Sequence, residues 1–358
     1  MSKGLACFAL VCALSLLGCG APQPITSCEP IGAATPLCGF QNPEDLALLP
    51  GGREVLVSEY GESGERAGRI SLLDLASNEH TSLFAGAEPV APGPWGALDC
   101  AGPPSKAFSP HGIHFAQRAD GLLQLLVVNH GGRESVEMFE VMRDGGRWQL
   151  AWRGCALAPE DLLNDVVALP EGGFLVTRFA PKPRLLLLFA LSKAMLFGAD
   201  TGWVYAWSRE RGFSELPGTR ASGSNGVELS ADGEKIFLNL TLANEVLRID
   251  RRTGAIEARA SVPQPDNSTW TSDGRLLVAS LRGPARDLFS CSGIERGSCP
   301  MPFAIVALDP KTMETTTVYE GGPGTPSGAA TVALEANDAL LLGTYAGDRI
   351  VRVKDTRR

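Results

Sequence analysis

Several common chemical signatures are missing from this 358-residue chain. It has no G-x-S-x-G nucleophile elbow, no P-loop and no H-E-x-x-H, so the usual serine esterase, nucleotide and zinc protease sites lack sequence support. It has no basic stripe and a net charge of −8, so nucleic acid is excluded as an expected partner while a bound cation is compatible. Aromatic residues make up only 7%, but 44% of residues are apolar, which is enough for a sizeable core.

Zinc-site spacing is also absent among the nine cysteines. Two of them lie in an N-terminal apolar run, and Cys19 follows it. The six that remain form an even set in a chain that begins like an exported protein, so disulfides are expected, although sequence does not separate the possible pairings. The nearest partners along the chain are Cys28 with Cys38 and Cys291 with Cys299; the other two are Cys100 and Cys155.

The N-terminus has the form of a secretory signal, with Lys3, an apolar run from Leu5 to Leu17 and a small residue before Cys19. We predict a signal peptide over 1–18, a tether over 19–37 and one domain over 38–358. The run 16–19 (LLGC) resembles the lipobox of bacterial lipoproteins, which implies a lipid on Cys19 and anchoring in a bacterial cell envelope, on its periplasmic side or surface. An ordinary signal peptide and an uncleaved anchor are the alternatives.

A repeated unit follows, consisting of a polar residue or pair, an apolar strand, a turn with glycine and a second apolar strand. Copies begin near residues 44, 111, 164, 225, 266 and 327, as in "PEDLALLPGGREVLVSEY" and "LLNDVVALPEGGFLVT". Further alternating segments, such as "RISLLDLAS" and "AIVALDPKT", supply two more strands per unit. The chain is therefore predicted to be all-β, a six-bladed β-propeller.

One segment departs from the strand pattern. Residues 184–197, "RLLLLFALSKAMLF", predict an inserted apolar helix, too short to cross a bilayer. It either packs over one face of the propeller, where it could touch a membrane or an apolar substrate, or is a buried helix or strand of the core.

The first strand of every propeller blade lines the central channel, so equivalent residues of the repeats should form a ring. Their oxygen-bearing side chains suit Ca²⁺, and the five ligands expected are Glu44, Asn164, Asn225, Asp266 and Asn267. Each of them alone is more simply explained as a turn residue that bonds its own backbone. Five in one repeat phase favour a metal site.

His111 occupies the same phase and breaks the oxygen pattern. If Asp120-Gly121 is a two-residue hairpin turn, His111 lies opposite His130, and the two imidazoles could touch, one as base and one orienting it. A slip of one residue in register would separate them. His114 is expected in the strand interior and His80 in a surface loop.

These motifs, in this order, resemble the paraoxonase/arylesterase family, within the gluconolactonase-like group of calcium-dependent six-bladed propellers. The likeness covers about residues 38–285 and continues weakly beyond. It implies two calcium ions: a catalytic one on the five oxygen ligands, and a deeper structural one on Asp45, Asp165 and the backbone carbonyl of Ile113. It also implies that His111 and His130 form a dyad that activates water. Members of the animal branch join their ends by a disulfide, but the last ten residues here contain no cysteine, so we expect the ring of blades to close by strand pairing alone.

The resemblance implies a hydrolase of lactones or aryl esters, acting on a small-molecule substrate. Two stretches depart from the family pattern, Arg178-Phe179 and Ser280-Leu281. These positions belong to the substrate pocket and to a second proposed base that the resemblance implies. One alternative is a sugar-lactone hydrolase of the gluconolactonase type. The two departures keep open a second alternative, a propeller that calcium only stabilises and that acts as a binding module.

Overall fold

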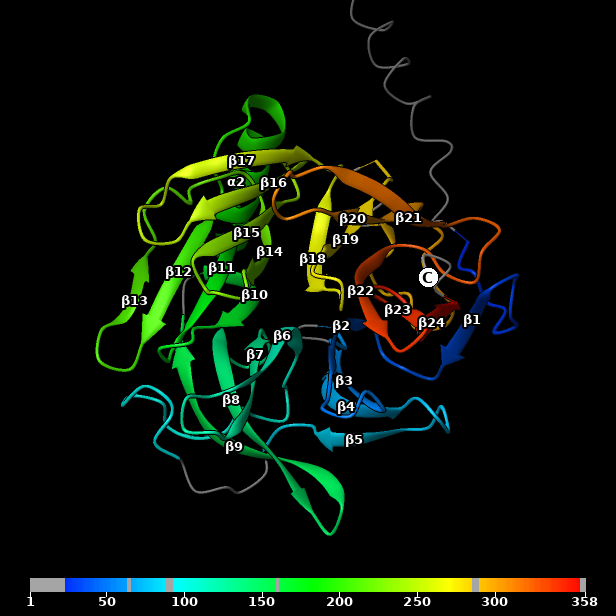
Figure 1. Cartoon of the computed structure of the whole chain (residues 1–358), viewed down its shortest axis with the longest axis horizontal. Coiled ribbons are helices and arrows are strands. Elements are labelled where there is room, and N and C mark those ends of the chain that lie inside the picture. The colour runs from blue at the N-terminus through cyan, green and yellow to red at the C-terminus, as the bar shows by residue number, and fades with distance from the viewer. Residues whose placement is uncertain (1–22, 63–65, 88–92, 159–160, 285–289, 355–358) are drawn as a thin grey trace, which may run out of the picture.

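The computed structural model describes residues 23–62, 66–87, 93–158, 161–284 and 290–354. Six four-stranded antiparallel sheets surround a central axis, as Figure 1 shows. The predicted six-bladed propeller is therefore confirmed. The predicted signal peptide and Cys19 lie outside the described residues.

Each blade is a meander whose first strand is innermost. Blades 1 and 2 contain β2 (Pro43–Leu48), β3 (Glu54–Glu59), β4 (Arg69–Asp74) and β5 (His80–Phe84), then β6 (Pro110–Gln117), β7 (Leu123–Asn129), β8 (Ser135–Asp144) and β9 (Arg147–Leu157). Blades 3 and 4 contain β10 (Asp161–Ala168), β11 (Phe174–Pro181), β12 (Trp203–Ser208) and β13 (Gly212–Glu215), then β14 (Ser224–Leu229), β15 (Lys235–Leu240), β16 (Glu245–Asp250) and β17 (Ile256–Ser261). Blade 5 contains β18 (Pro265–Trp270), β19 (Leu276–Leu281), β20 (Phe303–Leu308) and β21 (Thr315–Gly321); blade 6 contains β22 (Ala330–Ala336), β23 (Ala339–Thr344), β24 (Arg349–Lys354) and β1 (Ala34–Cys38).

The hydrophobic core is divided into six clusters, each between two neighbouring blades. Strand β3 shows how the sequence produces this. Its alternate residues point to opposite faces of the sheet, so Val55 and Val57 pack against blade 6 while Leu56 packs against blade 2. Apolar residues on both faces of the inner strands are what a radial stack of sheets requires.

The ring closes through β1, the first strand of the described residues, which pairs with β24, the last of them. Figure 1 shows the two side by side. The pairing joins Ala34 to Val353 and Cys38 to Arg349 without a disulfide to the C-terminal strand, as predicted. Strand β1 begins inside the segment predicted as a tether, so the propeller includes part of residues 19–37.

Three disulfides join all six cysteines of the described residues. The nearest-neighbour pairs, Cys28–Cys38 and Cys291–Cys299, are confirmed. The third, Cys100–Cys155, ties the loop before blade 2 to the outer strand β9 of that blade. These covalent links restrain loops and edges rather than the channel.

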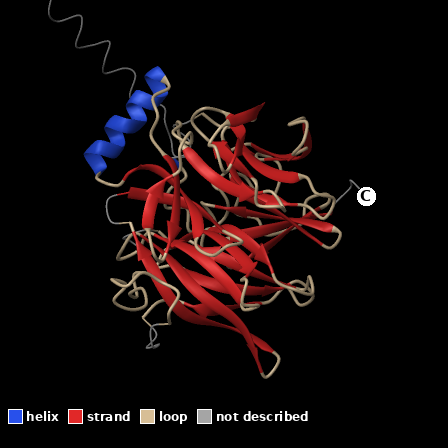
Figure 2. Ribbon diagram, turned by 60° about the vertical axis from the view of Figure 1, so that its left-hand side comes forward, coloured by secondary structure: helices blue, strands red, loops and turns tan. Residues whose placement is uncertain are grey.

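The predicted helix is present as α2 (Arg184–Phe197), which contacts β11. Figure 2 shows it at the margin of the strand body. Leu185 is 82% exposed and Phe197 78%, and only Leu191 and Ala194 are buried. The alternative of a buried core segment is wrong. In the described part of the chain no helix is both long and apolar enough to cross a membrane.

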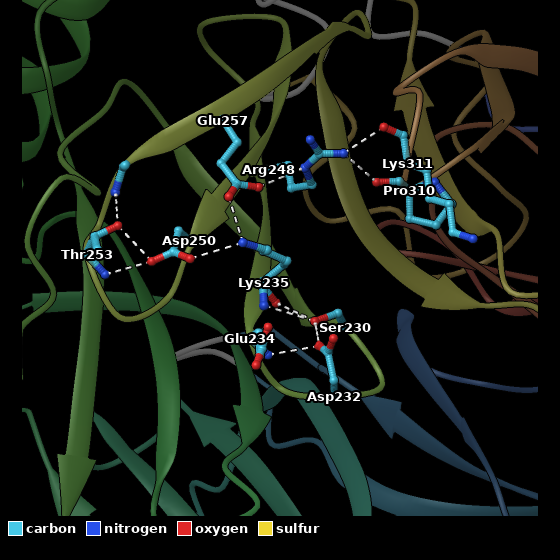
Figure 3. Close-up of polar contacts among 11 residues, drawn as sticks. Ser230, Asp232, Glu234, Lys235, Arg248, Asp250, Thr253, Glu257, Pro310 and Lys311 are labelled. Atoms are coloured by element: carbon cyan, nitrogen blue, oxygen red, sulfur yellow. Dashed lines mark hydrogen bonds and ion pairs between the residues drawn. The ribbon is translucent and has the colours of Figure 1, made fainter.

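A polar network on the outer strands of blade 4 links it to blade 5, as Figure 3 shows. The Lys235 ammonium reaches Asp250 at 3.0 Å and Glu257 at 2.6 Å. The Arg248 guanidinium donates to the carbonyls of Pro310 (2.9 Å) and Lys311 (2.7 Å), which lie on the loop after β20. Such exposed pairs contribute little stability each, and the network lies away from the channel.

Candidate functional site: an oxygen-lined cavity beside two histidines

Every innermost strand departs from regular pairing near its first residues. The irregular positions in blades 1 to 6 are Glu44, His111-Gly112, Asn164-Asp165, Asn225-Gly226, Asp266-Asn267 and Thr331. An irregularity of this kind leaves a residue out of the ladder and bends the strand. Through these irregularities one residue from each blade lines a common cavity: Glu44, His111, Asn164, Asn225, Asp266 and Thr331. The fifth predicted ligand, Asn267, does not line the cavity but bonds Glu44.

This site cavity has a volume of about 350 Å³. Its polar lining includes the predicted residues Glu44, His111, His130, Asn164, Asn225 and Asp266, and also Thr241, Ser292 and Thr331. Its remaining lining is largely apolar or aromatic: Tyr60, Leu162, Leu163, Phe179, Leu281 and Tyr345.

Four buried side-chain oxygens at this site have no hydrogen-bond partner: Glu44 Oε2, Asn164 Oδ1, Asn225 Oδ1 and Asn267 Oδ1. Two of the amides are held through their nitrogens. Asn225 Nδ2 donates to Thr241 Oγ1 at 2.9 Å, and Asn267 Nδ2 donates to Glu44 Oε1 at 2.7 Å. A buried acceptor without a donor costs about 1–3 kcal/mol. Four in one place indicate that these oxygens serve a ligand.

No lysine or arginine of the described residues neutralises the carboxylates of the site. Burial raises the pKa of Asp266 to about 7, and burial together with Asp45 and Asp266 raises the pKa of Glu44 well above its usual value. Within the described residues, neither Glu44 nor Asp266 forms an ion pair with a lysine or arginine. A bound cation would supply the missing charge.

The donor set fits calcium. It offers two carboxylates and three amides, all hard oxygen ligands, to an ion that takes six to eight. No group of three or more His, Cys, Asp or Glu side chains in the described ranges lies close enough to hold an ion. Amide oxygens make up most of the predicted set, so Asn164, Asn225 and Asn267 would have to complete the coordination.

The two predicted histidines meet, but not in the predicted register. The hairpin turn is longer than Asp120-Gly121, because the backbone N–H of Arg118 donates to the Leu122 carbonyl. Regular pairing of the two strands includes His114, which lies opposite Leu126, but not His111. The irregularity at His111-Gly112 then displaces the strand, and His130 lies just beyond the end of β7. The ring centroids are 5.0 Å apart and the planes are inclined by 58°.

The hydrogen bonds of His111 define which of its nitrogens is available. Its Nδ1 lies 3.0 Å from the Asn164 carbonyl, which can only accept, so Nδ1 carries the proton and Nε2 is free to accept one. Nε2 lies 3.8 Å from Glu44 Oε1. Burial, reinforced by His130, lowers the pKa of His111 to about 3. The imidazole is therefore neutral at neutral pH.

The sequence analysis missed Tyr60, Glu134 and Lys182. Tyr60 meets both imidazoles edge-on, with centroid distances of 5.4 Å to His111 and 6.0 Å to His130. The Glu134 carboxylate bonds His130 Nδ1 at 2.8 Å and the Lys182 ammonium at 2.9 Å. All three residues follow strand ends in different blades, where the repeat pattern stops. A polar or aromatic residue soon after the second strand of a repeat was the signal available.

The residues predicted to hold a second ion lie apart from the site cavity. Asp45, Asp165 and Ile113 line a separate cavity of about 140 Å³, together with Glu228, which the sequence analysis missed. Glu44 and Asp45 thus line different cavities, as do Asn164 and Asp165.

The two deeper aspartates already bind backbone amides of the next blade. Asp45 Oδ2 accepts from the Ile113 N–H at 2.7 Å, and Asp165 Oδ2 accepts from the Val227 N–H at 2.8 Å. Burial still raises the pKa of Asp45 to about 7 and, together with Asp45, raises the pKa of Asp165. These carboxylates connect blade 1 to blade 2 and blade 3 to blade 4.

His80, expected in a surface loop, is instead the first residue of β5. Its ring stacks on Phe40 with a centroid distance of 4.1 Å. It takes no part in the site.

Gly112 is required by the close approach of blade 3. A Cβ atom there would lie 2.6 Å from the Asn164 carbonyl oxygen and 2.7 Å from the Asp165 Cα. We expect Gly112→Ala to lower the free energy of unfolding by about 2–4 kcal/mol in urea denaturation, because backbone must shift. The control Gly121→Ala has no atom within 4 Å but a φ of +84°, so its cost should be about 1 kcal/mol. Equal costs would contradict the close-contact explanation.

Without a cation, the stability of the protein should fall as pH rises. Asp45 and Asp266 have a pKa of about 7 when folded against about 3.9 when unfolded. The folded state holds their protons more tightly, so this contribution is complete below about pH 4 and is lost as pH rises through 7. We expect the Tm of chelated protein to drop several degrees between about pH 5.5 and 8, and saturating calcium to remove the drop. A chelated protein with a flat or rising Tm would contradict this.

A family model described as Arylesterase matches residues 41–349, which is most of the chain. No curated protein sequence gives a significant match.

Solved structures with the same fold are distant in sequence. A gluconolactonase from Xanthomonas campestris is 16% identical, with a TM-score of 0.53 over 94% of this chain and 98% of its own. A luciferin-regenerating enzyme is 13% identical, with a TM-score of 0.54 over 90% and 94%. A calcium-binding regucalcin from Agrobacterium tumefaciens is 14% identical, with a TM-score of 0.50 over 90% and 94%. At these identities the likeness establishes the fold.

Proposed function

Because this chain belongs to the arylesterase family, we propose that it is a calcium-dependent hydrolase of lactones or aryl esters. Family membership supports a lactone or ester hydrolase in general. The observation that carries the finer proposal is the group of four buried oxygens without partners, on Glu44, Asn164, Asn225 and Asn267. Three of these residues line the cavity that His111 also lines.

The catalytic calcium would be held by the five predicted residues, Glu44, Asn164, Asn225, Asp266 and Asn267. When bound, it would polarise the ester carbonyl and stabilise the negative charge that develops on its oxygen. The second ion, on Asp45, Asp165 and the Ile113 carbonyl, would serve stability, because these residues line the other cavity and already join neighbouring blades.

The protein's own contribution to the reaction is proton transfer and exclusion of water. His111 is neutral, and the Asn164 carbonyl holds its Nδ1 proton, so Nε2 can take a proton from the attacking water. His130, 5.0 Å away between centroids, can receive that proton in turn. Tyr60 packs against both rings, and the side chains of His111 and His130 are only 16% and 6% exposed to water.

The cavity walls favour an apolar substrate. Leu162, Phe179, Leu281 and Tyr345 line the cavity and offer few groups that could bond sugar hydroxyls. Phe179 and Leu281 belong to the two stretches that depart from the family pattern, so these departures fall on the substrate side of the site. Aryl esters and alkyl lactones therefore fit better than sugar lactones.

A substrate panel tests this proposal. We expect purified protein to hydrolyse phenyl acetate and long-chain lactones at least tenfold more efficiently, in kcat/KM, than gluconolactone. A preference for gluconolactone would support the gluconolactonase-type alternative. No turnover on any substrate, with calcium still bound and stabilising, would support a binding module.

The place of action is also a proposal. The predicted signal over 1–18 and the lipobox resemblance before Cys19 support export and a lipid anchor in a bacterial cell envelope. Metabolic labelling with a palmitate analogue, compared between the natural sequence and Cys19→Ser, would test for the lipid.

A further inference from the structure

Glu134 is a fully buried carboxylate beside the candidate dyad that the proposed mechanism has not used. It lies in the turn between β7 and β8, and its side chain is 0% exposed. Oε1 accepts from His130 Nδ1 at 2.8 Å and from the Leu163 N–H at 2.8 Å, while Oε2 accepts from the Lys182 ammonium at 2.9 Å. Three donors from three segments thus converge on one carboxylate.

These contacts determine the orientation of His130. An ionised carboxylate can only accept, so His130 must carry its proton on Nδ1 and its Nε2 is the unprotonated nitrogen. His111 is held in the same tautomer by the Asn164 carbonyl. Both imidazoles therefore carry their proton on Nδ1.

Lys182 provides the charge that balances Glu134. It precedes helix α2 and reaches Glu134 from blade 3, and its side chain is 37% exposed. Burial alone would raise the pKa of Glu134, but His130 and Lys182 together hold it below the usual value. The same carboxylate also bonds the backbone of Leu163, next to the predicted ligand Asn164. Glu134 therefore connects the pair of histidines to the strand that carries the predicted ligand Asn164.

Glu137 is a second buried carboxylate of the same blade, and its contacts indicate a purely structural role. Glu137, also 0% exposed, is bonded by Arg133, Ser135 and Trp152, and none of these partners lines the site cavity. Glu134 instead bonds a residue that lines it.

We propose that Glu134, balanced by Lys182, is a positioning residue that fixes the tautomer of His130 and stabilises its imidazolium form during hydrolysis. This inference rests on the proposed ester or lactone hydrolysis. The arrangement gives His130 a carboxylate partner of the kind that orients a catalytic imidazole.

The test compares Glu134→Gln with the matched control Glu137→Gln in the full-length protein. A glutamine amide can donate as well as accept, so Glu134→Gln should lose the preference for the Nδ1–H tautomer of His130. ¹⁵N NMR of the histidine side chains, with His130→Gln to identify the signal, measures this without any substrate. We also expect kcat for phenyl acetate to fall about 10- to 100-fold with KM within about twofold.

Glu137→Gln should lower stability but leave both the tautomer and kcat unchanged. Lys182→Met should reduce kcat several-fold, and Lys182→Arg should restore it. An unchanged tautomer and kcat in Glu134→Gln, or an equal kcat loss in Glu137→Gln, would overturn the proposal. If the natural sequence hydrolyses no ester or lactone, the proposed function fails, while the NMR result still decides whether Glu134 fixes His130.

Discussion

Chelation of calcium should reduce hydrolysis of phenyl acetate by at least about 10³-fold and lower the Tm by several degrees. The activity loss follows because charge stabilisation in an ester hydrolase is commonly worth 10²–10³-fold for a single donor. The Tm loss follows because removing the ion would leave Glu44 and Asp266 buried without a counter-charge. Activity assays and thermal melts in chelator, then with calcium restored, measure both effects.

Asn225→Ala ties this dependence to the predicted ligand ring. Its unpartnered Oδ1 is removed while the surrounding strands stay paired. We expect calcium affinity, measured by isothermal titration, to fall at least about tenfold, with activity recovering only at higher calcium. The control Gln124→Ala removes a buried amide outside the site cavity and should keep natural affinity. Turnover that survives both chelation and Asn225→Ala would contradict the calcium mechanism.

His111→Gln should lower kcat by about 10²–10⁴-fold while leaving calcium affinity and Tm close to their natural values. General-base catalysis is worth about that much, and glutamine can still donate to the Asn164 carbonyl while lacking a basic nitrogen. Steady-state kinetics beside calcium titration separate the two effects.

His114→Gln is the matched control, because His114 lies on the same strand. It is largely buried, lines the deeper cavity with Asp45, and accepts the Ala168 N–H at 3.3 Å. Its loss should leave kcat within about twofold, since it does not reach the site cavity. If His111→Gln keeps full activity, the base must lie elsewhere while the metal proposal stands.

The predicted fold was accurate because propeller blades are local. Each blade is a meander of neighbouring strands, so its signature appears in one continuous stretch such as 162–177. The part of the fold that the sequence did not predict depends on pairing between residues far apart in the chain. Strand β1, at the start of the chain, completes blade 6 at its end, so the boundary at residue 38 cut through a blade.

The candidate site was predicted in part, for a related reason. Repeat phase identified Glu44, Asn164 and Asn225, because equivalent positions of a radial repeat must meet at the axis. The His111–His130 encounter was predicted from an incorrect register. It occurs because an irregularity in the strand brings back together two residues that regular pairing would have separated.

The sequence by itself determined the six repeats, the ring of oxygen-bearing side chains and the family, because all of these follow from order and spacing along the chain. Only the tertiary structure decided which ring oxygens lack partners, that adjacent residues such as Glu44 and Asp45 line different cavities, and that Glu134 and Lys182 reach His130. The physical reason is that strand irregularities and contacts between blades depend on backbone geometry across the whole ring. A repeat pattern identifies which residues occupy equivalent positions along the strands. It does not give the direction of a side chain where the strand is bent.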